Sequence, residues 1–427
     1  MTPTISLLGK RRFLPLFITQ FLNAFNDNVF KMAMVMLATY TIYKDPEQDA
    51  FFNALASGIF ILPFFLFSAL AGQLSDSSDK AMIARWVKTA EIGIMLVGAL
   101  GIYIHSIPLM LLALFAMGVH SSFFGPLKYA ILPQHLEKDE VLAGTGLVEA
   151  GTYIAILGGT ILGGLLPYKE AAITVIGISI VGRIAGQFIP PAPPEPDAPP
   201  LRIDWNIVRS SWRQVSATMH IPRLFLAICS ISFFWAIGMM LAAQFPPLVE
   251  NVLGSDRTVA TMFTALFSIG VAIGSVIINV LLKGKVSAKF APASVIVMGL
   301  FVLHLWWTVS HWAHVPGTGE QGLLSWREFL ALGKGDWVLV DLLGIAIFGG
   351  MFVVPLYAFL TTTVSKSETA RTIAANNIVN SGFMVIAAAV LALLAKVGFT
   401  VQDTLLSVAI ACLIAAAIAW KLHKACD

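Results

Sequence analysis

Long apolar runs separated by short polar segments dominate the sequence. A helix needs roughly 20 apolar residues to cross a hydrocarbon core about 30 Å thick. Runs of about this length predict spans over residues 13–43, 52–74, 82–104, 107–133, 141–166, 171–189, 223–249, 258–282, 291–312, 337–364, 371–396 and 401–422. We therefore expect an all-α, multi-pass membrane protein with twelve spanning helices.

Two segments recur at matching positions in the two halves of the chain. Residues 141–151 are similar to residues 372–382, and residues 123–129 are similar to residues 352–357. These echoes align the fifth and fourth predicted spans with the eleventh and tenth. Two parallel six-helix repeats are typical of major facilitator transporters. We expect an N-terminal bundle over 1–189, a cytoplasmic linker over 190–222 and a C-terminal bundle over 223–427.

The linker joins a proline-rich stretch to an amphipathic helix. Seven of the eleven residues 190–200 are proline, which predicts a stiff, extended spacer. Residues 203–220 then place apolar side chains at helical spacing with two arginines between them: Trp205, Val208, Trp212, Val215, Met219, Arg209 and Arg213. This pattern favours a helix lying on the inner leaflet. Docking of a partner enzyme is the alternative.

Composition narrows the class of protein. The chain is 57% hydrophobic and 12% charged, with a mean hydropathy of +0.82. Soluble proteins carry about 25% charged residues, so a soluble globular fold is excluded. The net charge of +3 is too small to indicate nucleic-acid binding. The three cysteines lack metal-ligand spacing, and GxSxG, HExxH and P-loop patterns are missing, so we expect no metal, no cofactor and no enzyme.

The distribution of Lys and Arg predicts the orientation. Most of them fall before the first span or in alternate loops, beginning with Lys10, Arg11 and Arg12. Lys88, near the start of the third span, is counted with the same group. Loops rich in Lys and Arg stay in the cytoplasm, so both termini are expected to be cytoplasmic.

Among the ionisable residues within predicted spans, three stand out: Asp27, Lys128 and Glu149. A charge at the bilayer centre costs about 3 kcal/mol on insertion scales, so such residues usually face a cavity or a partner. Charges of both signs suggest a cargo that carries both signs itself. Two structural alternatives stay open. Asp27 and Lys31 are four residues apart and can neutralise each other on one helix face, and Lys128 and Glu149 can form a buried salt bridge.

A polar stripe supports the cavity interpretation. Asn23, Asn26, Asp27 and Lys31 share one face of the first span, which is more polarity than one internal pair needs. We include all four in a candidate substrate site with Lys128, Glu149 and Tyr129.

Two further groups of residues are candidates for movement between states. Gly125, Pro126 and Pro355 weaken backbone hydrogen bonding within spans and favour bending, while Asn376, Asn377 and Asn380 offer uncharged polarity to a cavity or to neighbouring helices. The loop from Gly72 resembles the superfamily's inner-loop signature, and its residues predict a structural latch: Gly72, Asp76, Lys80 and Arg85. In this prediction Asp76 caps a neighbouring helix or pairs with Arg85 or Lys88.

Three segments resemble the lysophospholipid transporter family (LplT) of the major facilitator superfamily: Gln20–Asn28, Phe124–Leu132 and Gly146–Ala150. The stretch from Gly125 to Tyr129 is most similar to the transporter domain of members fused to an acyltransferase. The resemblance implies movement of lysophosphatidylethanolamine from the outer to the inner leaflet of the bacterial inner membrane for reacylation. It also implies a headgroup site that includes Asp27 and Lys128. The basic residue that standalone members carry in the seventh span is missing from residues 224–249.

The expected partners are therefore a lysophospholipid, membrane lipids and a lysophospholipid acyltransferase, and we expect a monomer. A zwitterionic headgroup needs a cation for its phosphate and an anion for its ammonium. We assign the phosphate to Lys128 and the ammonium to Asp27 with Glu149. Two alternatives remain: a proton-coupled exporter of drugs or small amphipathic solutes, and a membrane scaffold for an acyltransferase.

Overall fold

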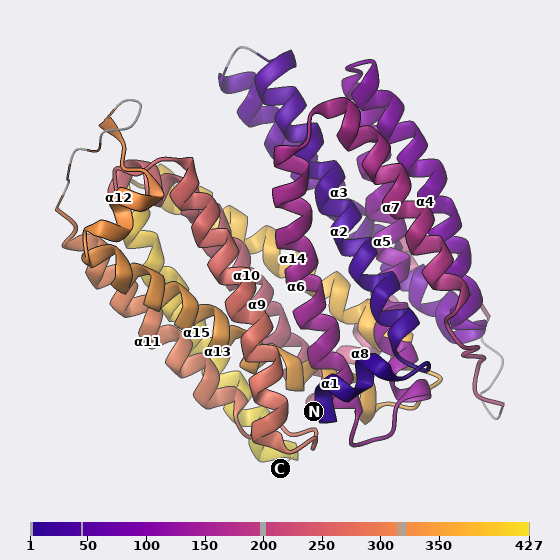
Figure 1. Cartoon of the computed structure of the whole chain (residues 1–427). Coiled ribbons are helices and arrows are strands. Elements are labelled where there is room, and N and C mark those ends of the chain that lie inside the picture. Colours follow the sequence, from indigo (N-terminus) through magenta and orange to yellow (C-terminus); the bar gives the residue numbers. More distant parts are fainter. Residues whose placement is uncertain are drawn as a thin grey trace. The chain divides into compact units, whose positions relative to one another are not determined.

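The computed structural model describes residues 3–43, 46–196, 202–313, 315, 317 and 322–426. These residues fold into helices joined by turns and loops (Figure 1). Apart from one isolated bridge between Ser255 and Leu324, this described part contains no β-structure. The predicted all-α class is therefore confirmed.

The first half of the chain runs from a short N-terminal helix to the amphipathic helix. Its elements are α1 (Pro3–Ser6), η1 (Leu7–Gly9), α2 (Leu14–Leu37), η2 (Ala38–Ile42), α3 (Pro46–Ser77), α4 (Lys80–Tyr103), α5 (Ile107–His135), α6 (Val141–Leu165), α7 (Tyr168–Gln187) and α8 (Ile207–Met219). The second half contains α9 (Pro222–Pro247), η3 (Leu248–Val252), α10 (Arg257–Leu282), α11 (Ala291–Ser310), α12 (Trp326–Ala331), α13 (Lys334–Thr363), α14 (Thr369–Lys396) and α15 (Val401–Cys426).

The predicted spans correspond to twelve long helices. Eleven helices of the described chain are long and apolar enough to cross a membrane. The remaining one is α2, whose 24 residues extend about 36 Å at 1.5 Å per residue. Its polar stripe lowers its hydropathy, although its length still suffices for a span. The protein is thus a multi-pass membrane protein.

The internal repeat is visible in local geometry. The first long helix of each half, α2 and α9, ends in a short π-helical turn, η2 and η3 respectively. In addition, the prolines predicted to bend the fourth and tenth spans lie inside α5 and α13. Similar irregularities at matching positions agree with the sequence echoes.

Contacts divide the chain into two compact units. One contains Met1–His220 together with Leu360–Ser381, and the other contains Ile221–Phe359 and Gly382–Asp427. The first turns of α14 thus belong to the first unit, whereas the rest of this helix continues into the second. The domain boundaries drawn from the sequence stay a prediction.

Within the first unit, α2 is the central element. It packs against α6 and α7, while α4 packs against α5 and α7. The contact with α6 is so close that it needs a glycine: a Cβ at Gly159 would lie 2.3 Å from the carbonyl oxygen of Phe25. A fully buried apolar cluster that includes Phe30, Met34 and Met95 fixes this part of the bundle. The polar residues of α2 are therefore held against fixed neighbours.

Candidate functional site

Asp27 is buried between α2 and α5. Its Oδ2 atom accepts a hydrogen bond from Ser121 Oγ at 2.7 Å and a longer one from Asn23 Nδ2 at 3.4 Å. Its Oδ1 atom has no hydrogen-bond partner among the described residues. Since a buried carboxylate oxygen normally accepts hydrogen bonds, this atom is open to a ligand donor.

Tyr129 connects the other two charges of the predicted site. Its hydroxyl donates to Glu149 Oε1, and the Lys128 ammonium lies 4.9 Å from the centre of its ring. Lys128 and Glu149 form no ion pair within the described chain. Instead, the charges of Glu149 and Asp27 both act on Lys128 through space. The structure thus brings Asp27, Lys128, Tyr129 and Glu149 together around α5.

The rest of the polar stripe has separate partners. Lys31 lies 5.9 Å from the ring centre of Phe60. Among the described residues Lys31 forms no ion pair with Asp27, so the internal neutralisation considered from the sequence is not formed. Asn26 turns away and donates to Glu91 Oε1 at 2.8 Å. Asn26 therefore belongs to a second cluster.

This second cluster was not found from the sequence. Lys88 and Glu91, three residues apart on α4, form an ion pair with side-chain exposures of 0% and 1%. His120 Nε2 on α5 lies 3.3 Å from the same Glu91 oxygen. The placement of Lys88 with the cytoplasmic loop charges is therefore wrong. It was misassigned because it lies close to the end of its span.

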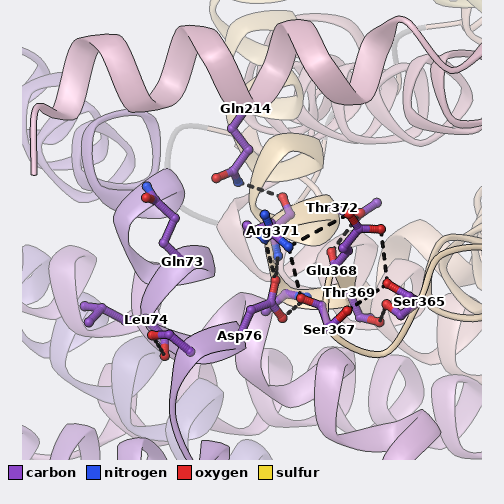
Figure 2. Close-up of polar contacts among 12 residues, drawn as sticks. Gln73, Leu74, Asp76, Gln214, Ser365, Ser367, Glu368, Thr369, Arg371 and Thr372 are labelled. Atoms are coloured by element: carbon purple, nitrogen blue, oxygen red, sulfur yellow. Dashed lines mark hydrogen bonds and ion pairs between the residues drawn. The ribbon is translucent and has the colours of Figure 1, made fainter. Parts of the chain in front are cut away.

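The predicted latch residues divide between two contacts. Asp76 accepts hydrogen bonds from the backbone amides of Ala370 and Arg371 at 3.1 and 3.0 Å, and from Arg371 Nε at 3.0 Å (Figure 2). It thereby caps the first turn of α14 rather than pairing with Arg85 or Lys88. A carboxylate at this position also interacts favourably with the helix dipole. We refer to these bonds as the Asp76–Arg371 contact.

Lys80 and Arg85 instead contact the segment that follows α7. The Lys80 amide donates to the Ala192 carbonyl at 3.0 Å, and Arg85 donates to the Ile189 carbonyl at 3.0 Å. Asp79 caps α4 and also accepts from the Ala192 amide at 2.9 Å. These bonds fix the start of the linker against α4.

Gly72 permits the approach of α14 to α3. A Cβ there would lie 2.8 Å from Ala374 Cβ and 2.9 Å from Arg371 Cα. We expect Gly72→Ala to displace the first turn of α14 at a cost of about 1–3 kcal/mol, as for other overpacked contacts. Amide exchange at Ala370 and Arg371 should accelerate roughly 5- to 150-fold, measured by hydrogen–deuterium exchange.

Gly93→Ala is the matched control for this prediction. A Cβ at Gly93 would meet nothing within 4 Å, so exchange at the start of α14 should stay at the wild-type rate. Wild-type exchange in Gly72→Ala would contradict the proposed close approach.

The candidate gating residues lie in distinct environments. A Cβ at Gly125 would lie 3.3 Å from Asn377 Nδ2, so these two positions are neighbours. Both amide atoms of Asn376 are buried without a partner among the described residues. Pro126 and Pro355 are within helices, as expected. Asn380 is buried too.

In the second half, the position equivalent to the Lys128 region is neutral. Trp235 Nε1 on α9 donates to the Tyr357 hydroxyl on α13 at 2.9 Å. The half nevertheless contains a buried acid that sequence reasoning missed, because Asp341 lies 2.8 Å from His304 Nδ1 with 1% side-chain exposure. The spacing of a histidine and an acid on different spans gave no sequence signal for this pair.

Comparison with known proteins assigns the chain to a family. A family model described as the Major Facilitator Superfamily matches residues 16–388. The chain belongs to the major facilitator superfamily. Solved structures agree with this fold. A bacterial homologue of the iron transporter ferroportin aligns with a TM-score of 0.71, 13% identity and coverage of 97% of this chain and 100% of that one.

A second solved structure, the human organic anion transporter MFSD10 (TETRAN), aligns with a TM-score of 0.73 and 13% identity, covering 98% of this chain and 100% of that one. At these identities the structures establish the fold alone.

Curated relatives within the superfamily are more informative. The chain is 26% identical over 399 residues to the lysophospholipid transporter LplT of Photorhabdus laumondii subsp. laumondii, covering 91% of this chain and 89% of the relative. It is 27% identical over 391 residues to LplT of Citrobacter koseri, covering 90% and 88%. The resemblance to this transporter family, first seen in three segments, thus extends over nearly the whole chain.

Proposed function

We propose that this superfamily member transports lysophospholipids. The observation that carries the proposal is its similarity, over about nine-tenths of its length, to curated lysophospholipid transporters. The arrangement around α5 supports it, because a cation and two carboxylates lie in one unit of the protein. This combination suits a zwitterionic headgroup better than a cargo of a single charge.

In this proposal Lys128 binds the lipid phosphate. Its ammonium lies over the Tyr129 ring and is not taken up by an ion pair in the described chain, so its three N–H donors are available. Glu149 is held by the Tyr129 hydroxyl. The ammonium of the headgroup binds Asp27, whose Oδ1 atom has no partner among the described residues. Asn23 and Lys31 extend the same polar face.

The cargo we favour is lysophosphatidylethanolamine, moved from the outer to the inner leaflet of the bacterial inner membrane for reacylation. Movement follows alternating access, and the single acyl chain stays against apolar helix faces or in the lipid at a lateral opening. Both termini are then cytoplasmic. The protein works as a transporter rather than as an enzyme, and a separate acyltransferase consumes the imported lipid. We expect a monomer.

Proteoliposomes test this proposal directly. Purified protein should increase the uptake of labelled lysophosphatidylethanolamine above that of protein-free vesicles, with no acyltransferase present. Uptake is measured with and without a protonophore, and a cationic drug serves as the competing substrate. Drug movement that collapses with the protonophore, in the absence of lysolipid movement, would support a proton-coupled exporter instead. If neither substrate moves, the scaffold interpretation gains support.

A further inference from the structure

The amphipathic helix α8 contacts the same turn of α14 that Asp76 binds. Gln214 Nε2 donates to the Arg371 carbonyl at 2.7 Å, and Figure 2 shows this side chain extending from its helix toward Arg371. Preceding α8, the Asp204 amide donates to Gln73 Oε1 at 2.9 Å. Gln73 is a neighbour of Gly72 on α3. Thus the linker is bonded to both sides of the Asp76–Arg371 contact.

The opposite side of α8 and the segment just before it carry exposed apolar side chains. Trp205, Val208 and Trp212 are 68%, 77% and 76% exposed. At 100° per residue, Val208 and Trp212 lie on a face of α8 distinct from that of Ser210, Gln214 and Thr218, which turns toward the bundle. Trp205 lies two residues before the helix begins at Ile207. Large aromatic side chains exposed together mark an interaction surface.

Positive charge borders this aromatic face. Residues 202–219 contain three arginines and one aspartate, which gives a net charge of +2. Arg209 and Arg213 are 70% and 62% exposed, and both pair with Asp204. The hydrogen bond from Arg209 holds the pKa of Asp204 below its ordinary value, so this carboxylate remains ionised at neutral pH. The excess of positive charge fits an anionic surface.

Chain connectivity places α8 at the membrane boundary. The helix packs against α3, whose last residue, Ser77, is also the end of a span. Only a short turn separates Met219, the last residue of α8, from Pro222, where the next span begins. A short helix tied to span ends on both sides, with aromatic residues flanked by arginines, fits the headgroup region of a bilayer.

We propose that the aromatic surface formed by Trp205, just before α8, and by Val208 and Trp212 on α8 binds anionic phospholipids, and that this binding stabilises the Asp76–Arg371 contact through Gln214. The partner is a lipid surface rather than a protein, because the positive charge flanks an aromatic face at the level of the span ends. Lipid composition then regulates how readily the first turn of α14 leaves α3. This regulation is separate from the headgroup site and does not depend on the identity of the cargo.

Hydrogen–deuterium exchange in lipid nanodiscs tests the proposal. The Ala370 and Arg371 amides are both bonded to Asp76. They should exchange at least about fivefold more slowly in nanodiscs that contain phosphatidylglycerol than in phosphatidylcholine alone. This factor corresponds to the roughly 1 kcal/mol that one arginine contributes to binding an anionic surface. The double variant Trp205→Ser/Trp212→Ser should lose this lipid response. Gln214→Ala should also lose it, while brominated anionic lipid still quenches the part of the tryptophan fluorescence that is missing from the double variant.

Trp86→Ser is the matched control, since Trp86 is 69% exposed on α4 and takes no part in the linker bonds. This variant should keep the full response. Equal exchange of the wild-type protein in both lipids would overturn the proposal, as would a full response in the double variant. Protection that appears only when an acyltransferase is added would overturn it in favour of a protein-docking face.

Discussion

Lys128→Ala is expected to lower the rate of lysophospholipid uptake by about 10- to 100-fold, because a hydrogen bond between charged groups contributes about 1.5–3 kcal/mol. The interaction that this variant would lose is the proposed one between the Lys128 ammonium and the lipid phosphate. Lys128→Arg should restore part of the rate, since a guanidinium also binds phosphate but needs more room. Uptake of labelled lysophosphatidylethanolamine into proteoliposomes measures both effects.

Lys169→Ala is the matched control for Lys128→Ala, because it also removes a lysine that lies beside a tyrosine ring. The Lys169 ammonium lies 5.9 Å from the ring centre of Tyr168, but outside the proposed site, and this variant should transport normally. Comparable protein yield and melting temperature for Lys128→Ala would exclude misfolding as the cause of any loss. Wild-type uptake by Lys128→Ala would remove this residue from the headgroup site.

Helix positions could be predicted because the bilayer imposes a length on every span. Apolar runs of about 20 residues have few other uses, so the predicted spans match the observed helices. Even α2 was found, although its polar stripe keeps it out of the eleven helices that are apolar enough to span by composition. The echo between residues 141–151 and 372–382 also places α6 and α14 at equivalent positions without knowledge of their contacts.

The site could be predicted only in part, since a sequence does not give the rotation of one helix against another. Asp27, Lys128 and Glu149 were evident because each lies well inside an apolar run. The sequence did not show that Tyr129 lies between Lys128 and Glu149, because a salt bridge between the two charges was equally consistent with their spacing. Only the packed α5 and α6 show that the Tyr129 hydroxyl reaches Glu149.

Burial of charge near the ends of spans is the hardest feature to predict. Lys88 lies only eight residues after Lys80, where α4 begins, so it was counted with the loop lysines although it falls inside the predicted span. Its burial results from contacts with α7 and from Glu91 one turn later. Asp341 was missed for a related reason, since its partner His304 is on another helix.

The buried Lys88–Glu91 pair leads to the largest expected change in stability. Glu91→Gln leaves the Lys88 ammonium buried without its anion, and removing one partner of such a pair typically costs roughly 3–5 kcal/mol. The variant should therefore have a sharply lower melting temperature and a lower yield in mild detergent. The amide oxygen that this substitution introduces would still accept from Asn26, so the loss reports on the ion pair rather than on that hydrogen bond.

The double variant Lys88→Met/Glu91→Gln distinguishes two contributions to the free energy of unfolding: the cost of a buried charge without its partner and the net stabilisation by the ion pair. Because desolvation offsets much of the attraction between two buried charges, the double variant should recover most of the stability lost by Glu91→Gln. Glu137→Gln is the surface control: its pair with Arg12 is 72% exposed on the Glu137 side, and such pairs contribute about 0–1 kcal/mol. A double variant as unstable as Glu91→Gln would show that Glu91 acts mainly through His120 and Asn26. Recovery in the double variant, together with unchanged lysolipid uptake, would assign the pair a structural role that is independent of the headgroup site.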